Sequence, residues 1–347
     1  MDTRKRNIGF DCLRATACLF IVLLHTTNST VVMYAQEMTF WRSVGAQIVI
    51  NNLMWCVPCF VMVTGALLLP AEKKITYRAL FSKYIARTVK AIVVFGVLFV
   101  ALEVIFNPAQ RTMEHVLDGL YKIFAGDSWA HMWYLYCLLG LYILLPAYKK
   151  IAALSDEKDI RYLLIVYAIF RSLMPLLRLG NIKYGIDIHV SSIYPFWLFL
   201  GYYLCRWGAK RSRSFYMALF AVSTALITAL TYVRMKWGVT ALDALFSYTS
   251  ILVIGQTIGL AGWFFQCREE GFGSVKKCLA NIDRHSFGIY LIHMAYVRLI
   301  YKHLHFDPYR LGLGGVPGIL LVVLVAFVLA YLTDMVMKKL PVFKSIV

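Results

Sequence analysis

The stretch at residues 10–25, FDCLRATACLFIVLLH, is apolar enough to cross a bilayer and still carries Asp11, Arg14 and His25. Ionisable side chains are costly in hydrocarbon, so inside a membrane span they point to a functional site. Arg14 and His25 are eleven residues apart, which is about three turns at 3.6 residues per turn, so both point in nearly the same direction. The stretch therefore predicts a membrane-spanning helix with a polar face, on which Arg14 and His25 are separated by roughly 16 Å along the axis.

The composition of the whole chain also indicates a membrane protein. Of its 347 residues, 60% are hydrophobic and 16% are charged, against about 25% charged in ordinary soluble domains. The connections between apolar runs are short, so we expect one integral-membrane domain over residues 1–347, an all-α polytopic bundle. Apolar runs of about 20 residues mark helical spans. We place ten spans, at 9–28, 45–69, 87–106, 129–148, 161–179, 191–207, 214–233, 243–265, 284–303 and 315–337.

The net charge of +18 would suggest nucleic acid as a partner of a soluble protein. Here we expect no nucleic acid, because basic residues hold cytoplasmic loops against the membrane. Most of the 36 Lys and Arg residues fall on the side of the N-terminus, so we expect both termini in the cytoplasm, with Arg14 near the inner end of its span and His25 near the outer end. Arg4-Lys5-Arg6 before an apolar run imitates a signal peptide, but no clean cleavage site follows, so we interpret this run as a retained first span.

The eight cysteines lie mostly in apolar segments and form neither a disulfide framework nor a paired metal-ligand pattern. Cys56 and Cys59 have the spacing of a redox pair, but they lie inside a predicted span, so redox chemistry is not favoured. We expect no bound metal.

Arg14 and His25 suit an anionic donor site that leads to a proton-transfer site. An Arg at the cytoplasmic end of a span suits a phosphate-bearing ligand, because guanidinium binds phosphate in bidentate fashion. A His deeper in the span suits a general base, and Asp11 would orient or neutralise Arg14. The alternative is that Arg14 snorkels to the interface and that His25 is an interfacial histidine. Arg87 and Lys90 share a helix face and would complete a phosphate site, unless they are only positive-inside anchors.

His131 and Trp133 open the predicted span 129–148 at the outer face. They would line an acceptor site beside His25, and the alternative for this segment is an aromatic belt at the membrane interface. Glu103, near the outer end of another span, would pair with a histidine or lie at the interface by chance.

Ser286, Tyr290 and His293 repeat at i, i+4 and i+7, so they share one face of a predicted helix. A polar stripe inside a bundle needs partners or water. These residues therefore contribute either to substrate binding or to hydrogen bonds between helices.

Four motifs together resemble the bacterial membrane-bound acyltransferase family 3, whose members O-acylate surface polysaccharides, lipopolysaccharide, peptidoglycan and some secreted small molecules. In chain order they are Arg14-x10-His25, Val57-Pro58-Cys-Phe60 through Thr64-Gly65, His131-Met-Trp133-Tyr134, and Ser286-Phe-Gly288-Ile-Tyr290-Leu-Ile-His293. They resemble the family's Arg-x10-His, VPxFFxxSG, HxWFL and SxGIYLxH stretches. The resemblance covers nearly the whole chain, and the chain most resembles stand-alone members linked to enterobacterial common antigen acetylation.

The resemblance implies an O-acetyltransferase of the bacterial inner membrane, in contact with membrane lipids. Its donor would be acetyl-CoA bound from the cytoplasm, and its acceptor a hydroxyl of a glycan or lipid-linked saccharide. The resemblance implies roles for Arg14 near the donor's phosphates or thioester and for His25 in transfer. With Asp11, which would orient or neutralise Arg14, they are the expected catalytic residues. The implied donor-binding residues are Arg14, Arg87 and Lys90, with Lys90 in place of the family's second Arg. The implied substrate-binding residues are His131, Trp133, Ser286, Tyr290 and His293.

Two questions stay open at the level of sequence. His25 acts either as a general base on the acceptor hydroxyl or as a nucleophile that carries the acetyl group. The same family fold also resembles the membrane part of certain serine racemases, so a permease for a small polar substrate such as serine is the rival function. A third possibility is a catalytically silent partner that passes acyl groups to another enzyme.

Overall fold

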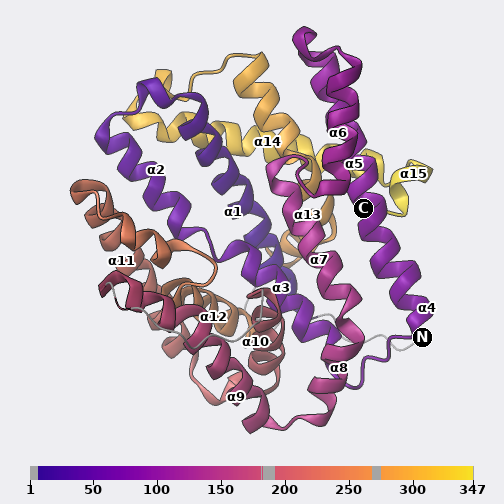
Figure 1. Cartoon of the computed structure of the whole chain (residues 1–347), viewed down its shortest axis with the longest axis vertical. Helices are drawn as coiled ribbons and strands as arrows, with labels where there is room; N and C mark the ends of the chain where they lie inside the picture. Colours follow the sequence, from indigo (N-terminus) through magenta and orange to yellow (C-terminus); the bar gives the residue numbers. More distant parts are fainter. Residues whose placement is uncertain (1–6, 181, 183–191, 268–274, 347) are drawn as a thin grey trace.

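The computed structural model describes residues 7–180, 182, 192–267 and 275–346, and every regular element in this part of the chain is a helix. Helix α1 (Ile8–Met33) contains the stretch 10–25 and begins at Asn7, whose side chain accepts a hydrogen bond from the backbone N–H of Gly9. It lies at the centre of the bundle (Figure 1). It contacts α2 (Phe40–Asn52), α3 (Cys56–Leu68), α12 (Ile251–Phe265), α13 (Val275–Arg298) and α14 (Val316–Met337).

The packing of α1 against α13 positions the polar residues of both helices. Contacts between the two helices, and on into the π-helical turn that follows α13 (Leu299–His303), advance together along the sequence, so α1 and α13 run parallel (Figure 1). In chain order the contacts are Arg14 with Asp283, Cys18 with Ser286, His25 with His293, and Thr30 with Tyr301. Two segments about 270 positions apart thus form one polar seam.

Glycine permits close approach of α3 to α10 (Tyr194–Trp207). A Cβ added at Gly65 would lie 1.8 Å from the carbonyl oxygen of Leu198, and one added at Gly201 would lie 1.9 Å from that of Met62. Small residues let helix backbones approach closely in membranes. This contact holds α3 and its Thr64 beside the half of α1 that carries Arg14.

A hairpin of two helices covers one side of α13. The segment begins with α4 (Tyr77–Ala79) and a π-helical turn (Leu80–Ile85). α5 (Ala86–Phe106) follows, and α6 (Met113–Ala125) packs back against it. Gly96 of α5 faces Ile123, and Gly119 of α6 faces Val100. The outer side of α6 exposes apolar side chains, so this helix presents an amphipathic surface to its surroundings. They are Met113, Leu117, Tyr121 and Phe124.

The remaining helices complete the bundle around these elements. α7 (Trp133–Ile143) and α8 (Leu145–Leu154) are bent by 56° at their junction, inside the predicted span 129–148. The others are α9 (Glu157–Ala168), α11 (Arg213–Trp237), which packs on α12, and the short α15 (Pro341–Lys344).

The all-α polytopic fold is confirmed. Within the described residues, seven helices are long and apolar enough to cross a membrane, and eight if the bent pair is one span. Two of the ten predicted spans do not meet these criteria of length and composition. The span 191–207 begins outside the described residues and holds only the 14-residue α10, and the span 284–303 belongs to α13, whose polar side chains lower its hydropathy. Arg4, Lys5 and Arg6 lie outside the described residues.

Both ends of the described chain lie at the same end of the bundle. Asn7 lines a cavity beside Arg14, and the carbonyl oxygen of Ile346 accepts a hydrogen bond from Arg87. Arg14 and Arg87 line one common cavity. This arrangement agrees with the expectation that the two termini share a side of the membrane.

Candidate active site

A cavity of about 490 Å³ lies among α1, α3, α7, α13 and the segment from Lys83 to Thr88. This volume is within the range of about 300–1,000 Å³ that is typical of small-molecule sites. Arg14 and, further along the helix, Ile21 line the cavity from α1. Tyr290 lines it from α13. The cavity therefore follows α1 from Arg14 towards His25.

Basic side chains dominate the charge of the cavity. Arg14, Lys83, Arg87 and Arg284 line it, and Asp283 is the one carboxylate among its lining residues. Two further cavities, of about 640 and 600 Å³, adjoin it and share residues with it. The first adds Lys73, and the second adds Lys276 and Lys277. Clustered cations of this kind favour a ligand with several negative charges.

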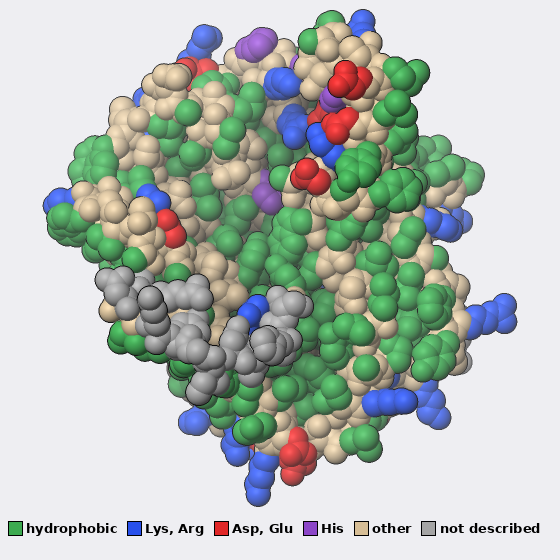
Figure 2. All heavy atoms as spheres, viewed as in Figure 1, with side chains coloured by type: hydrophobic (Ala, Val, Ile, Leu, Met, Phe, Trp, Pro, Cys, Tyr) green, Lys and Arg blue, Asp and Glu red, His purple; other side chains and the backbone are tan. Residues whose placement is uncertain are grey.

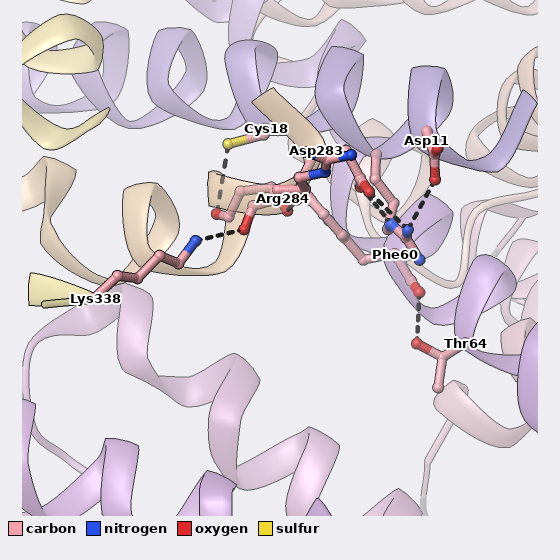
Figure 3. A network of polar contacts seen from close by, with 9 residues as sticks. Asp11, Cys18, Phe60, Thr64, Asp283, Arg284 and Lys338 are labelled. Carbon is pink, nitrogen blue, oxygen red and sulfur yellow. Dashed lines mark hydrogen bonds and ion pairs between the residues drawn. The ribbon is translucent and has the colours of Figure 1, made fainter. Parts of the chain in front are cut away.

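Two carboxylates hold the guanidinium of Arg14. Nε and Nη2 donate to the two oxygens of Asp283 at 2.6 and 2.9 Å, and Nη2 also lies 3.3 Å from Oδ1 of Asp11. Figure 3 shows Asp283 and Asp11 approaching this group from different sides. Asp283 was not among the residues predicted from sequence. Its position in Asp283-Arg284-His285, a charged run that leads into an apolar segment, was the signal that could have found it.

Arg87 and Lys90, which were predicted to share a phosphate site, lie in different surroundings. Arg87 lines the cavity, its Nε donates to the carbonyl oxygen of Ile346 at 2.5 Å, and its guanidinium lies 4.8 Å from the ring centroid of Phe287. Lys90 is exposed and points to the hydroxyl of Ser345 at 3.5 Å. Arg87 alone of this pair faces the cavity.

Three histidines gather beyond the end of the cavity that lies farther from Arg14. Nδ1 of His25 lies 2.8 Å from Nε2 of His293, and the two rings are parallel to within 8° with their centroids 5.1 Å apart. The ring of His131 lies 6.2 Å from that of His25 and 5.4 Å from that of His293. His131 and His293 are buried, whereas His25 is partly exposed. Figure 2 shows histidine atoms in a hollow on the face over α1.

The hydrogen bonds of His293 determine which nitrogen of His25 is available for chemistry. Nδ1 of His293 lies 2.7 Å from the carbonyl oxygen of Tyr290, which only accepts, so this nitrogen carries the proton. In the neutral ring Nε2 of His293 is then an acceptor, and Nδ1–H of His25 donates to it. Nε2 of His25 is therefore left with a free lone pair, as a general base or a nucleophile requires.

Tyr290 lines the cavity and connects it to the three histidines through a contact with His131. The hydroxyl of Tyr290 donates to the backbone carbonyl of His131, and the two rings are 5.8 Å apart. Nε2 of His131 contacts the carbonyl oxygen of Leu291 at 3.1 Å, while its buried Nδ1 has no partner within the described structure. A buried acceptor of this kind calls for a ligand or a water. Ser286 lines the cavity and donates its hydroxyl proton to the carbonyl oxygen of Asp283.

Trp133 lies elsewhere. Its ring packs against Tyr194 and Tyr248, with centroids 5.6 and 5.7 Å away, and it is not among the residues that line the cavity. The structure therefore brings His131 to His25, as predicted, and places Trp133 in an aromatic group between α7 and α10. Within the described residues, no group of three or more His, Cys, Asp or Glu side chains is arranged to hold a metal ion.

Comparison with protein families gives one match, which covers nearly the whole chain. The family described as an acyltransferase domain matches residues 7–335. The chain thus belongs to the acyltransferase 3 family and is a membrane acyltransferase. The comparisons with curated proteins and with solved structures give no match.

Proposed function

We propose that this acyltransferase moves an acetyl group from acetyl-CoA, bound from the cytoplasmic side of the bacterial inner membrane, to a hydroxyl of a glycan acceptor at the outer face. The observation that carries the proposal is the pairing of His25 with His293. It leaves a reactive nitrogen beyond the end of a cationic cavity that begins at Arg14.

The charge of the cavity supports a coenzyme A donor. Coenzyme A carries several phosphate groups, and charge-assisted bonds from Arg and Lys are the strong ones for phosphate. Lys83, Arg87 and Arg284 bring such donors to the cavity wall. Arg14 plays a different part, because Asp283 already engages its Nε and Nη2. Arg14 and Asp283 act as one unit that shapes the floor of the donor site.

The course of the cavity supports transfer along α1. Ile21 is seven residues beyond Arg14, about 10 Å along a helix axis, and His25 follows about 6 Å further. The long flexible arm of coenzyme A carries the thioester away from the phosphates. With its phosphates at the cations, a bound donor would therefore direct its acetyl group towards His25.

Two chemical schemes fit the free Nε2 of His25. As a general base it takes the proton of the acceptor hydroxyl, the oxygen attacks the thioester carbonyl, and the departing thiolate recovers the proton. As a nucleophile it attacks the thioester carbonyl and expels coenzyme A as the thiolate; the acceptor oxygen then displaces the imidazole from the acetyl group, and the thiolate takes up the hydroxyl proton. In both schemes His293 fixes the tautomer of His25, and the unpartnered Nδ1 of His131 offers an acceptor for the incoming hydroxyl.

The test uses purified protein in lipid nanodiscs with labelled acetyl-CoA and a glycan extract from cells that lack the gene. We expect label to move to glycan, and the variant His25→Asn to bind acetyl-CoA without transferring label. Rapid-quench trapping of acetyl on His25 would support the nucleophilic scheme. A protein that neither binds nor hydrolyses acetyl-CoA would overturn the proposal. Uptake of serine by the same protein in sealed proteoliposomes would favour the permease.

A further inference from the structure

A second cavity, of about 240 Å³, lies between α5 and α13 near the ends of both helices. Its walls are mainly apolar. Along each helix the lining side chains recur every three or four residues, so they form one continuous face on α5 and one on α13. The apolar members are Leu98, Leu102, Phe106, Ile292, Ala295 and Leu299. We call this cavity the α5–α13 groove.

Basic side chains lie at one end of the α5–α13 groove, and two of them, Arg298 and Lys302, carry a positive charge. Arg298 ends α13, and Lys302 and His303 come from the π-helical turn Leu299–His303 that follows it. Short π-helical turns are rare and occur frequently at functional sites. Figure 2 shows basic, acidic and histidine side chains gathered in the corresponding region of the surface, between α6 and the end of α13.

Arg298 is held in a fixed orientation. Its guanidinium lies 3.8 Å from the ring centroid of Trp129, and its Nη1 donates to Oε1 of Glu103 at 2.9 Å. The indole N–H of Trp129 donates to the same oxygen at 2.7 Å, and His115 contacts Oε2 at 3.3 Å. Nε2 of His115 forms no hydrogen bond at this distance, so Glu103 has Arg298 and Trp129 as its hydrogen-bond partners. Its carboxylate orients Arg298 and balances one positive charge.

Lys302 adds a positive charge that this network does not balance. It is exposed, and within the described residues no ion pair joins it to a carboxylate. The α5–α13 groove therefore combines an apolar floor with a net positive end. An amphiphile with an anionic head matches this arrangement. A phosphate head suits Arg298 in particular, because the planar guanidinium binds phosphate oxygens in bidentate fashion.

We propose that the α5–α13 groove binds the phosphate and the first part of the tail of a single-chain lipid that carries the acceptor sugar. This inference rests on the proposed function. The volume, about 240 Å³, is below the usual range for drug-sized ligands of about 300–1,000 Å³, so it suits one tail rather than the two of a phospholipid.

The position of the groove links it to the reaction. Ile292 in its wall directly precedes His293 in the chain. The ring of Trp129, also in the wall, stacks on Phe99 at 4.1 Å and lies 6.3 Å from the ring of His131. A sugar attached to a phosphate at Arg298 would therefore be presented near the three histidines.

The test is a binding measurement with labelled polyprenyl phosphate on purified full-length protein in detergent micelles. We expect Lys302→Gln to weaken binding at least threefold and Arg298→Gln/Lys302→Gln to weaken it at least tenfold. Lys302 is exposed, so its variant is not expected to disturb folding. The matched control is Lys236→Gln, because Lys236 is likewise an exposed lysine but is not among the residues that line the groove, and it lies near the ring of Trp237. This control is expected to bind as the wild type does.

Two competitors define the ligand. Unlabelled polyprenol, which lacks the phosphate, should displace the probe at least tenfold less well than polyprenyl phosphate, and so should phosphatidylglycerol, a two-chain anionic lipid. Equal displacement by phosphatidylglycerol, or equal binding by wild type and both variants, would overturn the proposal. Acetyl-CoA binding is measured on the same samples. If the wild-type protein binds polyprenyl phosphate but not acetyl-CoA, the proposed donor is contradicted. If it binds acetyl-CoA but not polyprenyl phosphate, the proposed role of the α5–α13 groove is contradicted.

Discussion

Nδ1 of His25 and Nε2 of His293 lie 2.8 Å apart, and the two imidazole rings are parallel to within 8°. The carbonyl oxygen of Tyr290 places the proton of His293 on Nδ1, so the chain of hydrogen bonds runs from His25 to His293 to the backbone. His293 thereby does for His25 what a carboxylate does in many catalytic dyads, which is to fix its tautomer and its orientation.

Replacing His293 with Leu should leave His25 without its hydrogen-bond acceptor. We expect kcat for acetyl transfer to fall about 100-fold, a typical contribution of a positioned base, while the KM for acetyl-CoA changes less than twofold. Steady-state kinetics on purified protein measure both constants. His293→Gln should recover part of the loss, because its amide oxygen can accept from His25. Equal kcat values for wild type and His293→Leu would contradict the role of His293.

The two bonds between Arg14 and Asp283 predict strong coupling between these residues. Arg14→Lys keeps the charge but loses the planar fork, and Asp283→Asn loses the negative charge. We expect each single variant to weaken acetyl-CoA binding about tenfold, and the double variant to be little worse than either. The coupling energy from a double-mutant cycle should lie between about 0.5 and 3 kcal/mol. Additive losses would show that the two residues act independently.

Arg87 and Lys90 offer a matched pair of cations on one helix. Arg87 faces the cavity and Lys90 faces Ser345. Arg87→Gln should therefore raise the KM for acetyl-CoA about tenfold, because a hydrogen bond to a charged group contributes about 1.5–3 kcal/mol. Lys90→Gln should change it less than twofold. Thermal unfolding of both variants checks that a change in KM does not come from lost contacts to Ile346 or Ser345. Equal KM values for wild type and Arg87→Gln would remove Arg87 from the donor site.

The contact between α3 and α10 predicts a stability difference between two glycines. Gly65→Ala would bring a Cβ to 1.8 Å from the carbonyl oxygen of Leu198, so the helices must shift apart. We expect the free energy of unfolding to fall by about 1–3 kcal/mol. Gly140→Ala in α7 has open space around the added atom, and its helical position should gain about 0.5–1 kcal/mol. Thermal unfolding in detergent compares them, and equal melting temperatures would contradict the close packing.

Local patterns in the sequence determined a large part of this structure. Hydropathy determined the polytopic all-α fold, because an apolar run of sufficient length satisfies its backbone only as a helix in lipid. Helical periodicity placed Arg14 and His25 on one side of α1, because the period of 3.6 residues depends on the backbone alone. The run of motifs indicated the acyltransferase family. The number of spans was less secure, because α10 and α13 are shorter or more polar than an isolated span would be.

The partners of the polar residues were decided only by tertiary structure. Asp283 reaches Arg14 across 269 positions of sequence, and His293 reaches His25 across 268. No local pattern encodes these distances, since they arise from the parallel packing of α1 on α13. The same packing turned a residue predicted for substrate binding, His293, towards His25. The sequence by itself determined the polar face of α1 and its likeness to an acyltransferase. Only the fold decided which charges are already paired and which nitrogen remains free for chemistry.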